Sequence, residues 1–324
     1  MKKPTVIEGE PNGEPNIEQV TWNGLTWVNI EKPMPKETEY LSQNYSFHPM
    51  DLDDCLSRIQ RPKIDEYEDY LFIVLHFPLF SKNQRVTVPA QVSIFIGKDY
   101  LVTLHAGVLN PLVKLFSDCQ INEKARQENM KSSGYLLYRI IDRLIDYCLP
   151  ITDKIMENLE GVEDNLFDYT TPDPIEDLSG LRRDIISFRR TIWPMRAVIS
   201  TLEHKTEHFT KKDKSEEMEV YWGDLVDHID KIWDTLDECK EIIDGLHETG
   251  SILASHHTNQ VIRVLTIIAT IMMPLTLVAS IYGMNIHLPG GLGEGSLVTF
   301  LILLFIMLFV IGSMLFFFRR RHWI

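Results

Sequence analysis

The chain has 324 residues, of which 46 are acidic and 32 basic, so its formal net charge is −14. The length allows for one or two soluble domains, and the acidic excess argues against a nucleic-acid-binding surface, which needs basic residues. Four cysteines stand far apart without a CxxC pair. They predict free thiols and neither a disulfide framework nor a zinc ribbon.

The N-terminal part of the chain has the composition of a globular protein. Residues 1–17 are rich in Pro, Gly, Glu and Asn and are expected to form a disordered tail. Residues 18–130 hold a helical patch at Met50–Ile59 and several strand-like runs. The runs are Val20–Ile30, Tyr70–Phe77, Gln91–Ile96 and Tyr100–His105, and the turn Gly97-Lys98-Asp99 joins the last two. This region is predicted to be a mixed α/β domain on the cytoplasmic side.

A helical stalk domain is predicted over residues 131–260. Apolar periodicity indicates one helix over Tyr135–Tyr169, a second over Ile175–Phe209, and a third that begins near Glu216. The third helix shows no convincing break for over sixty residues. At about 1.5 Å per residue it would be roughly 90 Å long, which is far beyond a globular helix. It continues directly into an apolar segment.

Two segments near the C-terminus, 261–282 and 297–318, have the length and composition of membrane helices. The first carries several Thr and Ser residues, and a helix with a polar stripe prefers a protein interior or an aqueous path to lipid. The basic tail 319–324 places the C-terminus in the cytoplasm by the positive-inside rule. The chain is therefore expected to cross the inner (plasma) membrane twice, with both termini cytoplasmic and the loop 283–296 outside.

The first membrane segment has a candidate pore-lining face. Polar residues on it could supply rings of oxygen atoms, and apolar residues could form constrictions that gate by dewetting. The alternative for the threonines is a hydrogen bond to the carbonyl four residues earlier, in a helix that faces lipid. The candidates recur at a helix-like interval and are Asn259, Ile262, Leu265, Thr270, Met273, Thr276 and Ser280.

The outer loop opens with Tyr282-Gly283-Met284-Asn285. Taken alone, this tetrapeptide is compatible with a simple helix C-cap. Placed between two terminal membrane spans, it resembles the GMN signature of the CorA family of magnesium and divalent-cation channels. The resemblance implies that Gly283, Met284 and Asn285 form the selectivity filter, with Asn285 as a metal-contacting residue. Magnesium holds its water shell tightly, and conduction requires binding that is favourable yet weak. A ring of neutral amide oxygens from Asn285 suits a hydrated ion better than carboxylates.

The resemblance to the CorA family is not confined to the loop. The likeness extends over Arg263–Thr276 and over the order of α/β domain and long helix. The resemblance implies an α+β fold and a funnel-shaped homopentamer, with the first membrane helix around one pore. It also implies uptake of hydrated Mg²⁺, and of Co²⁺ and Ni²⁺, down the electrochemical gradient, without an organic cofactor.

The same resemblance implies that intracellular Mg²⁺ regulates the channel. Asp224 occupies the place where family members carry a sensing aspartate, and Asp227 follows it on the same helix. The usual partner of the sensing residue, on the α/β domain, appears in this chain as Ser81. We expect a closed state when a cation bridges subunits at this site and an open state when the cation is lost.

Two other functions stay open at this stage. The loop sequence Ile-His-Leu-Pro-Gly-Gly after Asn285 is similar to the loops of ZntB zinc transporters, and His287 could bind a softer ion. This alternative is a proton-coupled Zn²⁺ transporter. The second is a membrane-anchored scaffold that transports nothing. The sequence has no nucleotide-binding loop, nucleophile elbow or HExxH motif, so no enzyme is predicted. The expected partners are further copies of the chain, divalent cations and the lipid bilayer.

Overall fold

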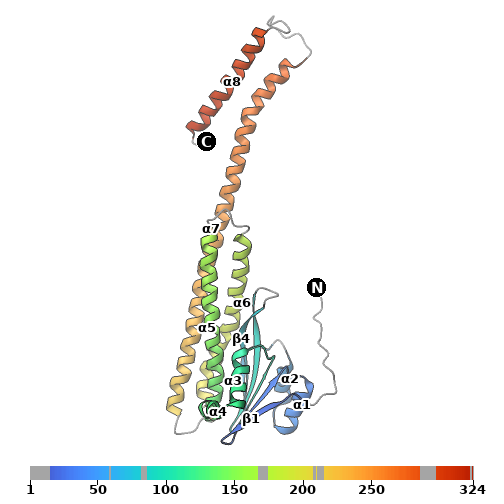
Figure 1. The fold of residues 1–324 in the computed structure, drawn as a ribbon, viewed down its shortest axis with the longest axis vertical. Coiled ribbons are helices and arrows are strands. Elements are labelled where there is room, and N and C mark those ends of the chain that lie inside the picture. Colours follow the sequence, from blue (N-terminus) through green and yellow to red (C-terminus); the bar gives the residue numbers. More distant parts are fainter. Residues whose placement is uncertain are drawn as a thin grey trace. The chain divides into compact units, whose positions relative to one another are not determined.

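The structure, a computed structural model, describes residues 15–57, 60–81, 86–166, 174–206, 209, 215–284, 297–321 and 323. Its internal packing divides the chain into two units, Met1–His247 and Glu248–Ile324. The first unit contains a sheet and most of the helices, and the second contains the apolar C-terminal segments (Figure 1). The α+β fold class expected from the sequence is confirmed.

A six-stranded sheet forms the centre of the first unit, in the order β1-β2-β6-β5-β4-β3. Its only parallel pair among the described strands is β2 with β6, and the other neighbours are antiparallel. The strands are β1 Glu18–Trp22, β2 Leu25–Glu31, β3 Lys63–Glu66, β4 Tyr70–Ser81, β5 Val86–Gly97 and β6 Tyr100–His105. The runs predicted at Tyr70, Gln91 and Tyr100 are thus confirmed as strands, with β5 and β6 forming the expected hairpin.

The expected single run Val20–Ile30 is in fact a hairpin of two strands. Asn23 and Gly24 both adopt positive φ angles, of 47° and 85°, and separate β1 from β2. An Asn-Gly pair is the usual sequence of such a two-residue turn, because both positions require the left-handed region. Apolar and polar residues alternate on both sides of the turn, so the whole run looked like one strand. The Asn-Gly dipeptide was the signal that could have predicted the turn.

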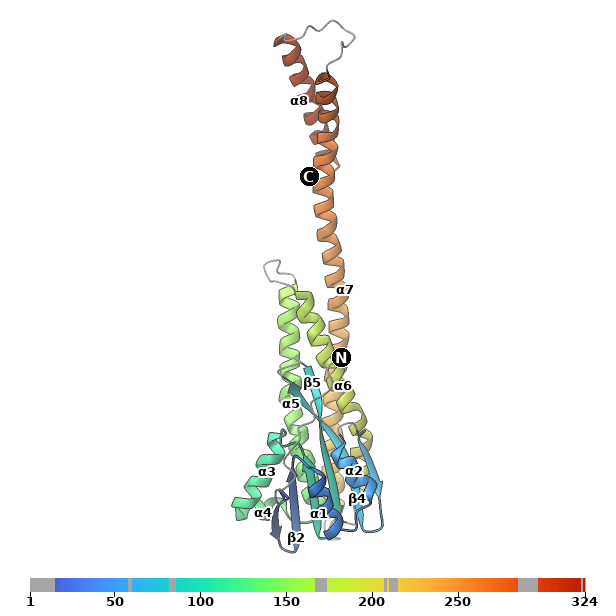
Figure 2. The same cartoon turned by 90° about the vertical axis from the view of Figure 1, so that its right-hand side faces the viewer.

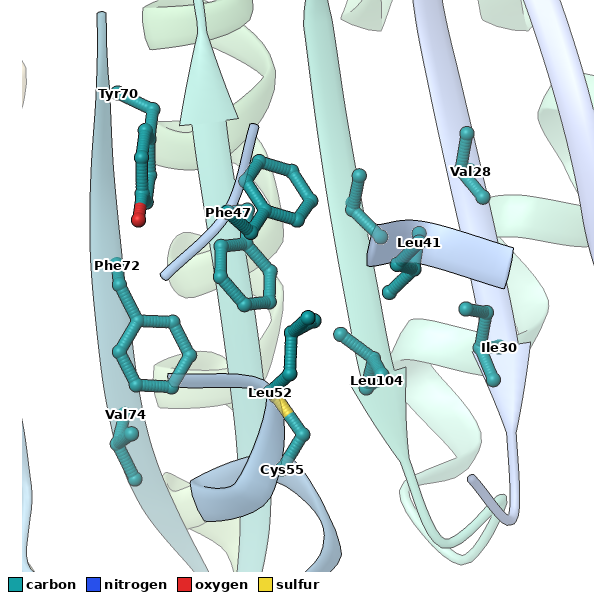
Figure 3. Packing of buried hydrophobic residues seen from close by; sticks show 12 residues of the cluster. Val28, Ile30, Leu41, Phe47, Leu52, Cys55, Tyr70, Phe72, Val74 and Leu104 are labelled. Carbon is teal, nitrogen blue, oxygen red and sulfur yellow. The ribbon is translucent and has the colours of Figure 1, made fainter. Parts of the chain in front are cut away.

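Two short helices cover one face of the sheet, α1 Pro35–Asn44 and α2 Pro49–Leu56. Figure 3 shows Leu41 of α1 and Leu52 of α2 packed over side chains of the sheet strands. Phe47, between the two helices, stacks on Phe95 of β5 with ring centroids 4.0 Å apart. The helical patch predicted from Met50 corresponds to α2.

Helix α6 covers the opposite face, together with α5. The described bounds are α3 Asn110–Ile121, α4 Glu123–Asn129, α5 Ser133–Leu166 and α6 Pro174–Lys205. The carboxylate of Asp184 on α6 accepts a hydrogen bond from the backbone N–H of Thr87 on β5. The Ser187 hydroxyl donates to the Thr87 carbonyl at 2.5 Å. β4 pairs with this stretch of β5 on one side, and these two bonds join α6 to its other side, where β6 does not reach.

Helix α7, Ser215–Tyr282, is the long helix expected from the sequence. In the first unit it packs beside α5 and α6 (Figure 2). Its buried side chains recur every three or four residues, which places them on one face: Trp222, Leu225, Ile229, Ile232, Leu236, Cys239 and Ile243. Tyr221 stacks on Tyr138 of α5, with ring centroids 5.0 Å apart. All four cysteines are buried free thiols.

In the second unit, the C-terminal part of α7 lies beside α8, Leu297–Arg320 (Figures 1 and 2). Both helices are long and apolar enough to cross a membrane. The residues that join them, 285–296, lie outside the described part of the chain.

Candidate ion pathway

The membrane segment of α7 has one long face that the chain leaves uncovered. All seven candidate pore residues are exposed: Asn259, Ile262, Leu265, Thr270, Met273, Thr276 and Ser280. Met273 is 75% exposed, the largest value among the apolar candidates. In a membrane, such a face meets either lipid or other copies of the protein.

The opposite face of the same segment is turned toward α8. Ile267 is only 7% exposed, and the residues that follow it at helical spacing are half-buried: Ile271, Pro274 and Val278. At 3.6 residues per turn, this face lies almost opposite Ile262, Met273 and Thr276. Packing within the chain therefore leaves the candidate pore face free. Leu265 lies well within this face, about 160° round the helix from Ile267, whereas Thr270 lies at its edge, only about 60° from Ile267.

The threonine hydroxyls of this segment all donate to the helix backbone. Thr266 Oγ1 donates to the Ile262 carbonyl at 2.7 Å, and Thr270 Oγ1 to the Thr266 carbonyl at 2.6 Å. Thr276 Oγ1 lies 3.0 and 2.9 Å from the carbonyls of the residues four and three positions earlier. This is the back-bonding that the sequence left open as an alternative. It also fixes each hydroxyl as an acceptor, because its proton is already engaged.

Thr266 is a residue that the sequence-based selection passed over in favour of Leu265. It is exposed and lies one turn from Ile262, toward the edge of the free face, about 100° round the helix from the buried Ile267. The signal that could have found it is a strict alternation of three- and four-residue steps from residue 259 to residue 280.

The C-terminal end of α7 carries the first part of the candidate filter. The Gly283 N–H donates to the Ala279 carbonyl at 2.9 Å, so the last turn of the helix remains closed. A Cβ atom at Gly283 would lie 3.1 Å from that same carbonyl oxygen. Met284 follows with half of its side chain exposed. Asn285 and His287 lie outside the described residues.

Three of the acidic residues on α7 are paired with arginines of α6. Arg182 lies 2.9 Å from Asp244, Arg189 lies 2.6 Å from Asp237, and Arg196 forms a two-pronged pair with Asp230. The arginines are seven residues apart and so are the aspartates, in opposite order along antiparallel helices. We call these three ion pairs the arginine ladder.

The ladder affects the acids electrostatically. The hydrogen bond from Arg196 holds the pKa of Asp230 below its ordinary value. Lys240, with a further contribution from Arg182, likewise lowers the pKa of Asp244. The stalk aspartates are therefore of two kinds, which the sequence analysis did not separate. Those of the ladder are neutralised within their own chain.

Asp224 and Asp227 are outside the ladder. Both are exposed, and Asp224 has one nearby basic group, His228 Nε2, at 3.8 Å. Ser81 is the last residue of β4 and pairs with Val86 of β5. Within the described residues, no group of three or more His, Cys, Asp or Glu side chains is placed to hold a metal ion.

An α/β domain, a long helix and a second apolar helix follow one another along the chain, and the last two include segments long and apolar enough to cross a membrane. The sequence profile of the family described as CorA-like Mg²⁺ transporter protein matches residues 22–320. The chain belongs to the CorA family. It is accordingly a divalent-cation transporter and not an enzyme, which removes the alternative of a non-transporting scaffold.

Relatives and solved structures agree with this assignment. The cobalt/magnesium transport protein CorA of Thermotoga maritima is 32% identical over 261 residues, which are 80% of this chain and 73% of the relative. The complete structure of the CorA magnesium transporter from Methanocaldococcus jannaschii shares the fold, with a TM-score of 0.78 and 23% identity. That likeness covers 96% of this chain and 95% of the other. The zinc transport protein ZntB of Pectobacterium carotovorum is 21% identical over 97% of this chain and 92% of its own.

Proposed function

We propose that the chain is a homopentameric channel for hydrated Mg²⁺, with Co²⁺ and Ni²⁺ as further substrates. The observation that carries this proposal is the free face of α7, which lies away from α8 and carries hydroxyl groups fixed as acceptors. Five such faces around one axis would enclose a pore. Each water molecule of a hydrated cation points its hydrogen atoms outward, where they can be accepted by Thr266, Thr276 and Ser280.

The remaining candidates have roles along the same path. Asn285, with the carbonyl of Gly283, would form the ring at the outer mouth, and Asn259 would stand at the cytoplasmic entrance. Between them, Ile262, Leu265 and Met273 would form apolar constrictions, where a narrow pore empties of water and stops conduction. The ion would move with the membrane potential, which contributes about 4.6 kcal/mol per 100 mV to a divalent cation.

The regulation we propose depends on the acids that the ladder leaves unpaired. Asp224 and Asp227 are exposed carboxylates on α7. In a ring of copies they would repel one another, and a bound Mg²⁺ would relieve that repulsion and hold the channel closed. With both termini in the cytoplasm, the first unit also lies there. Asp224 is then exposed to the internal Mg²⁺ concentration and can respond to it.

A second candidate function is proton-coupled zinc transport. It is favoured by the match to a zinc transport protein along 97% of the chain. The carboxylates and amides on the exposed face of α7 suit a hard, hydrated ion better than zinc, which prefers nitrogen and sulfur ligands. Magnesium therefore remains the first proposal.

Ion flux into proteoliposomes tests both proposals. The wild-type protein is expected to pass Mg²⁺, Co²⁺ and Ni²⁺ when the interior is negative, and Asn285→Ala should reduce the Mg²⁺ flux at least about tenfold, because the amide ring at the mouth is lost. Ser313→Ala on α8 is the matched control and should leave the flux unchanged. Zinc flux that follows an imposed pH gradient, without Mg²⁺ flux, would instead establish the zinc carrier. A protein that passes none of these ions would contradict both.

A further inference from the structure

Helix α6 carries a second row of arginines that form no ion pair with the described residues. Arg183 and Arg190 each follow a ladder arginine by one residue, which turns them about 100° further round the helix. Both are exposed, and no carboxylate of the described residues lies within ion-pair distance of either. They differ in this respect from Arg182 and Arg189.

Two large apolar side chains lie between the two rows of arginines. Trp193 is 57% exposed and Ile186 is 41% exposed, and they are one heptad apart on α6. Trp193 contacts Trp233 of α7, with ring centroids 4.5 Å apart, yet most of its surface remains free. Exposed tryptophan beside arginine is the composition of interface hot spots.

In the first unit, the side of α7 that faces away from its buried residues carries negative charge. Asp234, Glu238 and Glu241 are exposed, share one face by their three- and four-residue spacing, and have no ion pair with the described residues. Lys231 is the single basic residue on that stretch of the face. Each chain therefore offers a basic and aromatic face on α6 and an acidic face on α7.

The arginine ladder shows which residues of α6 and α7 lie at the same height along the two antiparallel helices. Because Arg189 is level with Asp237, Arg190 is level with residue 236, and Arg183 is similarly level with residue 243. In a cyclic ring, neighbouring copies are related by rotation alone, so heights along the axis are preserved. In height along the axis, Arg190 then differs by two residues, or about 3 Å, from both Asp234 and Glu238 of the neighbouring copy, and Arg183 differs by the same amount from Glu241.

We infer that the face of α6 formed by Arg183, Ile186, Arg190 and Trp193 docks on the acidic face of α7 in the neighbouring copy. This inference rests on the proposed ring and adds a specific interface to it. The matched arginines end at the level of residue 236. Asp224 and Asp227 face a part of α6 without arginine, so they remain available to a cation.

Disulfide trapping in the full-length membrane protein tests this interface. Arg190→Cys combined with Glu238→Cys should give, on mild oxidation, a series of bands on a non-reducing gel that correspond to two or more linked chains. Neither single variant should do so. Arg182→Cys with Asp244→Cys is the matched control, because that pair lies within one chain and should close without a change in apparent mass. The native cysteines are all buried and should contribute little background.

A charge exchange gives a second measurement. Arg190→Glu should lower the fraction of intact rings in native mass measurements, and adding Glu238→Arg should restore it. If rings form normally but the cysteine pair never links chains, the interface is wrong while the ring stands. Linkage by Arg190→Cys alone would indicate a two-fold contact and would also overturn the inference. A protein that remains monomeric would overturn the ring itself.

Discussion

Among single residues, His105 is held in an environment that suits only its neutral form. It is 2% exposed, its Nε2 lies 2.9 Å from the Asn29 side-chain oxygen, and the Gly107 N–H donates to its Nδ1 at 3.0 Å. The proton of the ring is therefore on Nε2. Thr103 donates to the same Asn29 oxygen at 2.7 Å. Burial lowers the pKa of His105 to about 4.

This histidine makes stability depend on pH. Its pKa is depressed on folding, so the stabilisation is complete above the unfolded value of about 6.5 and is lost as the pH falls toward 4. The wild-type melting temperature should therefore fall over that window. His105→Gln, which can keep both hydrogen bonds, should flatten the curve, measured by thermal unfolding in detergent. His204→Gln, at an exposed position, should behave as wild type. An unchanged slope in His105→Gln would contradict the assignment.

Asp51 also makes stability depend on pH, but in the opposite direction. Burial raises the pKa of Asp51, although hydrogen bonds from Tyr67 and Tyr70 oppose that shift. Protonation of Asp51 on acidification favours the folded state, opposite to the effect of His105. The difference between wild type and variant isolates the histidine. The sequence identified His105 only as a strand residue, because its partner Asn29 is far away in the chain.

At the scale of elements, the arginine ladder joins α6 to α7. Arg189 is its best-protected member, since it pairs with Asp237 and its guanidinium also lies 4.5 Å from the Trp233 ring centroid. A cation over an aromatic ring adds roughly 0.5–1 kcal/mol at an accessible site. The ladder therefore fixes the register of the two helices more than it adds to their stability.

Arg189→Ala should lower the free energy of unfolding by about 1 kcal/mol, because both contacts are lost. Chemical denaturation of the detergent-solubilised protein measures the change. Lys154→Ala is the control: it removes an exposed pair with Glu157 and should cost less than about 0.5 kcal/mol. Equal losses in the two variants would show that the ladder is an ordinary surface feature. A double-mutant cycle with Asp237→Ala separates the ion pair from the ring contact.

The positions of the helices and strands could be predicted better than the way in which they pair with one another. The helices and the β5–β6 hairpin follow from periodicity and from the turn Gly97-Lys98-Asp99, which are local signals. The parallel pairing of β2 with β6 joins residues more than seventy positions apart, and no local signal specifies it. The ladder was missed for a similar reason, because a seven-residue spacing on each helix becomes an ion-pair register only when the two helices lie antiparallel.

For the whole molecule, the sequence led to the family through a short motif and two apolar segments. The free face of α7 could also be anticipated, because helical spacing alone places residues 259–280 on it. Which residues of this segment are covered within the chain, such as Ile267, could not be anticipated, since that depends on how two apolar helices pack. Periodicity likewise could not distinguish the acids of the ladder from those left exposed.

The regulation proposed above depends on several copies of the chain forming a ring, so it is tested on the membrane-embedded protein. Asp224→Lys should abolish inhibition of the current by internal Mg²⁺, because each copy then carries an ammonium group in place of a carboxylate, which repels Mg²⁺ and cannot bind it. Currents recorded from membrane patches at increasing internal Mg²⁺ measure this. Glu160→Lys, an exposed carboxylate on α5, is the control and should retain inhibition. Full inhibition in Asp224→Lys would exclude Asp224 as a sensor.

The pairing of β2 with β6 also bears on how the chain is made. The sheet cannot close before His105 has left the ribosome, because β6 lies between β2 and β5. Once it has, every strand of the sheet is available, and the apolar segment that begins near Val261 is still to be synthesised. At about 5–20 residues per second, that interval is roughly 8–30 s. Small domains generally fold within seconds. The sheet therefore has time to form before the first membrane helix emerges, so folding and membrane insertion take place in sequence.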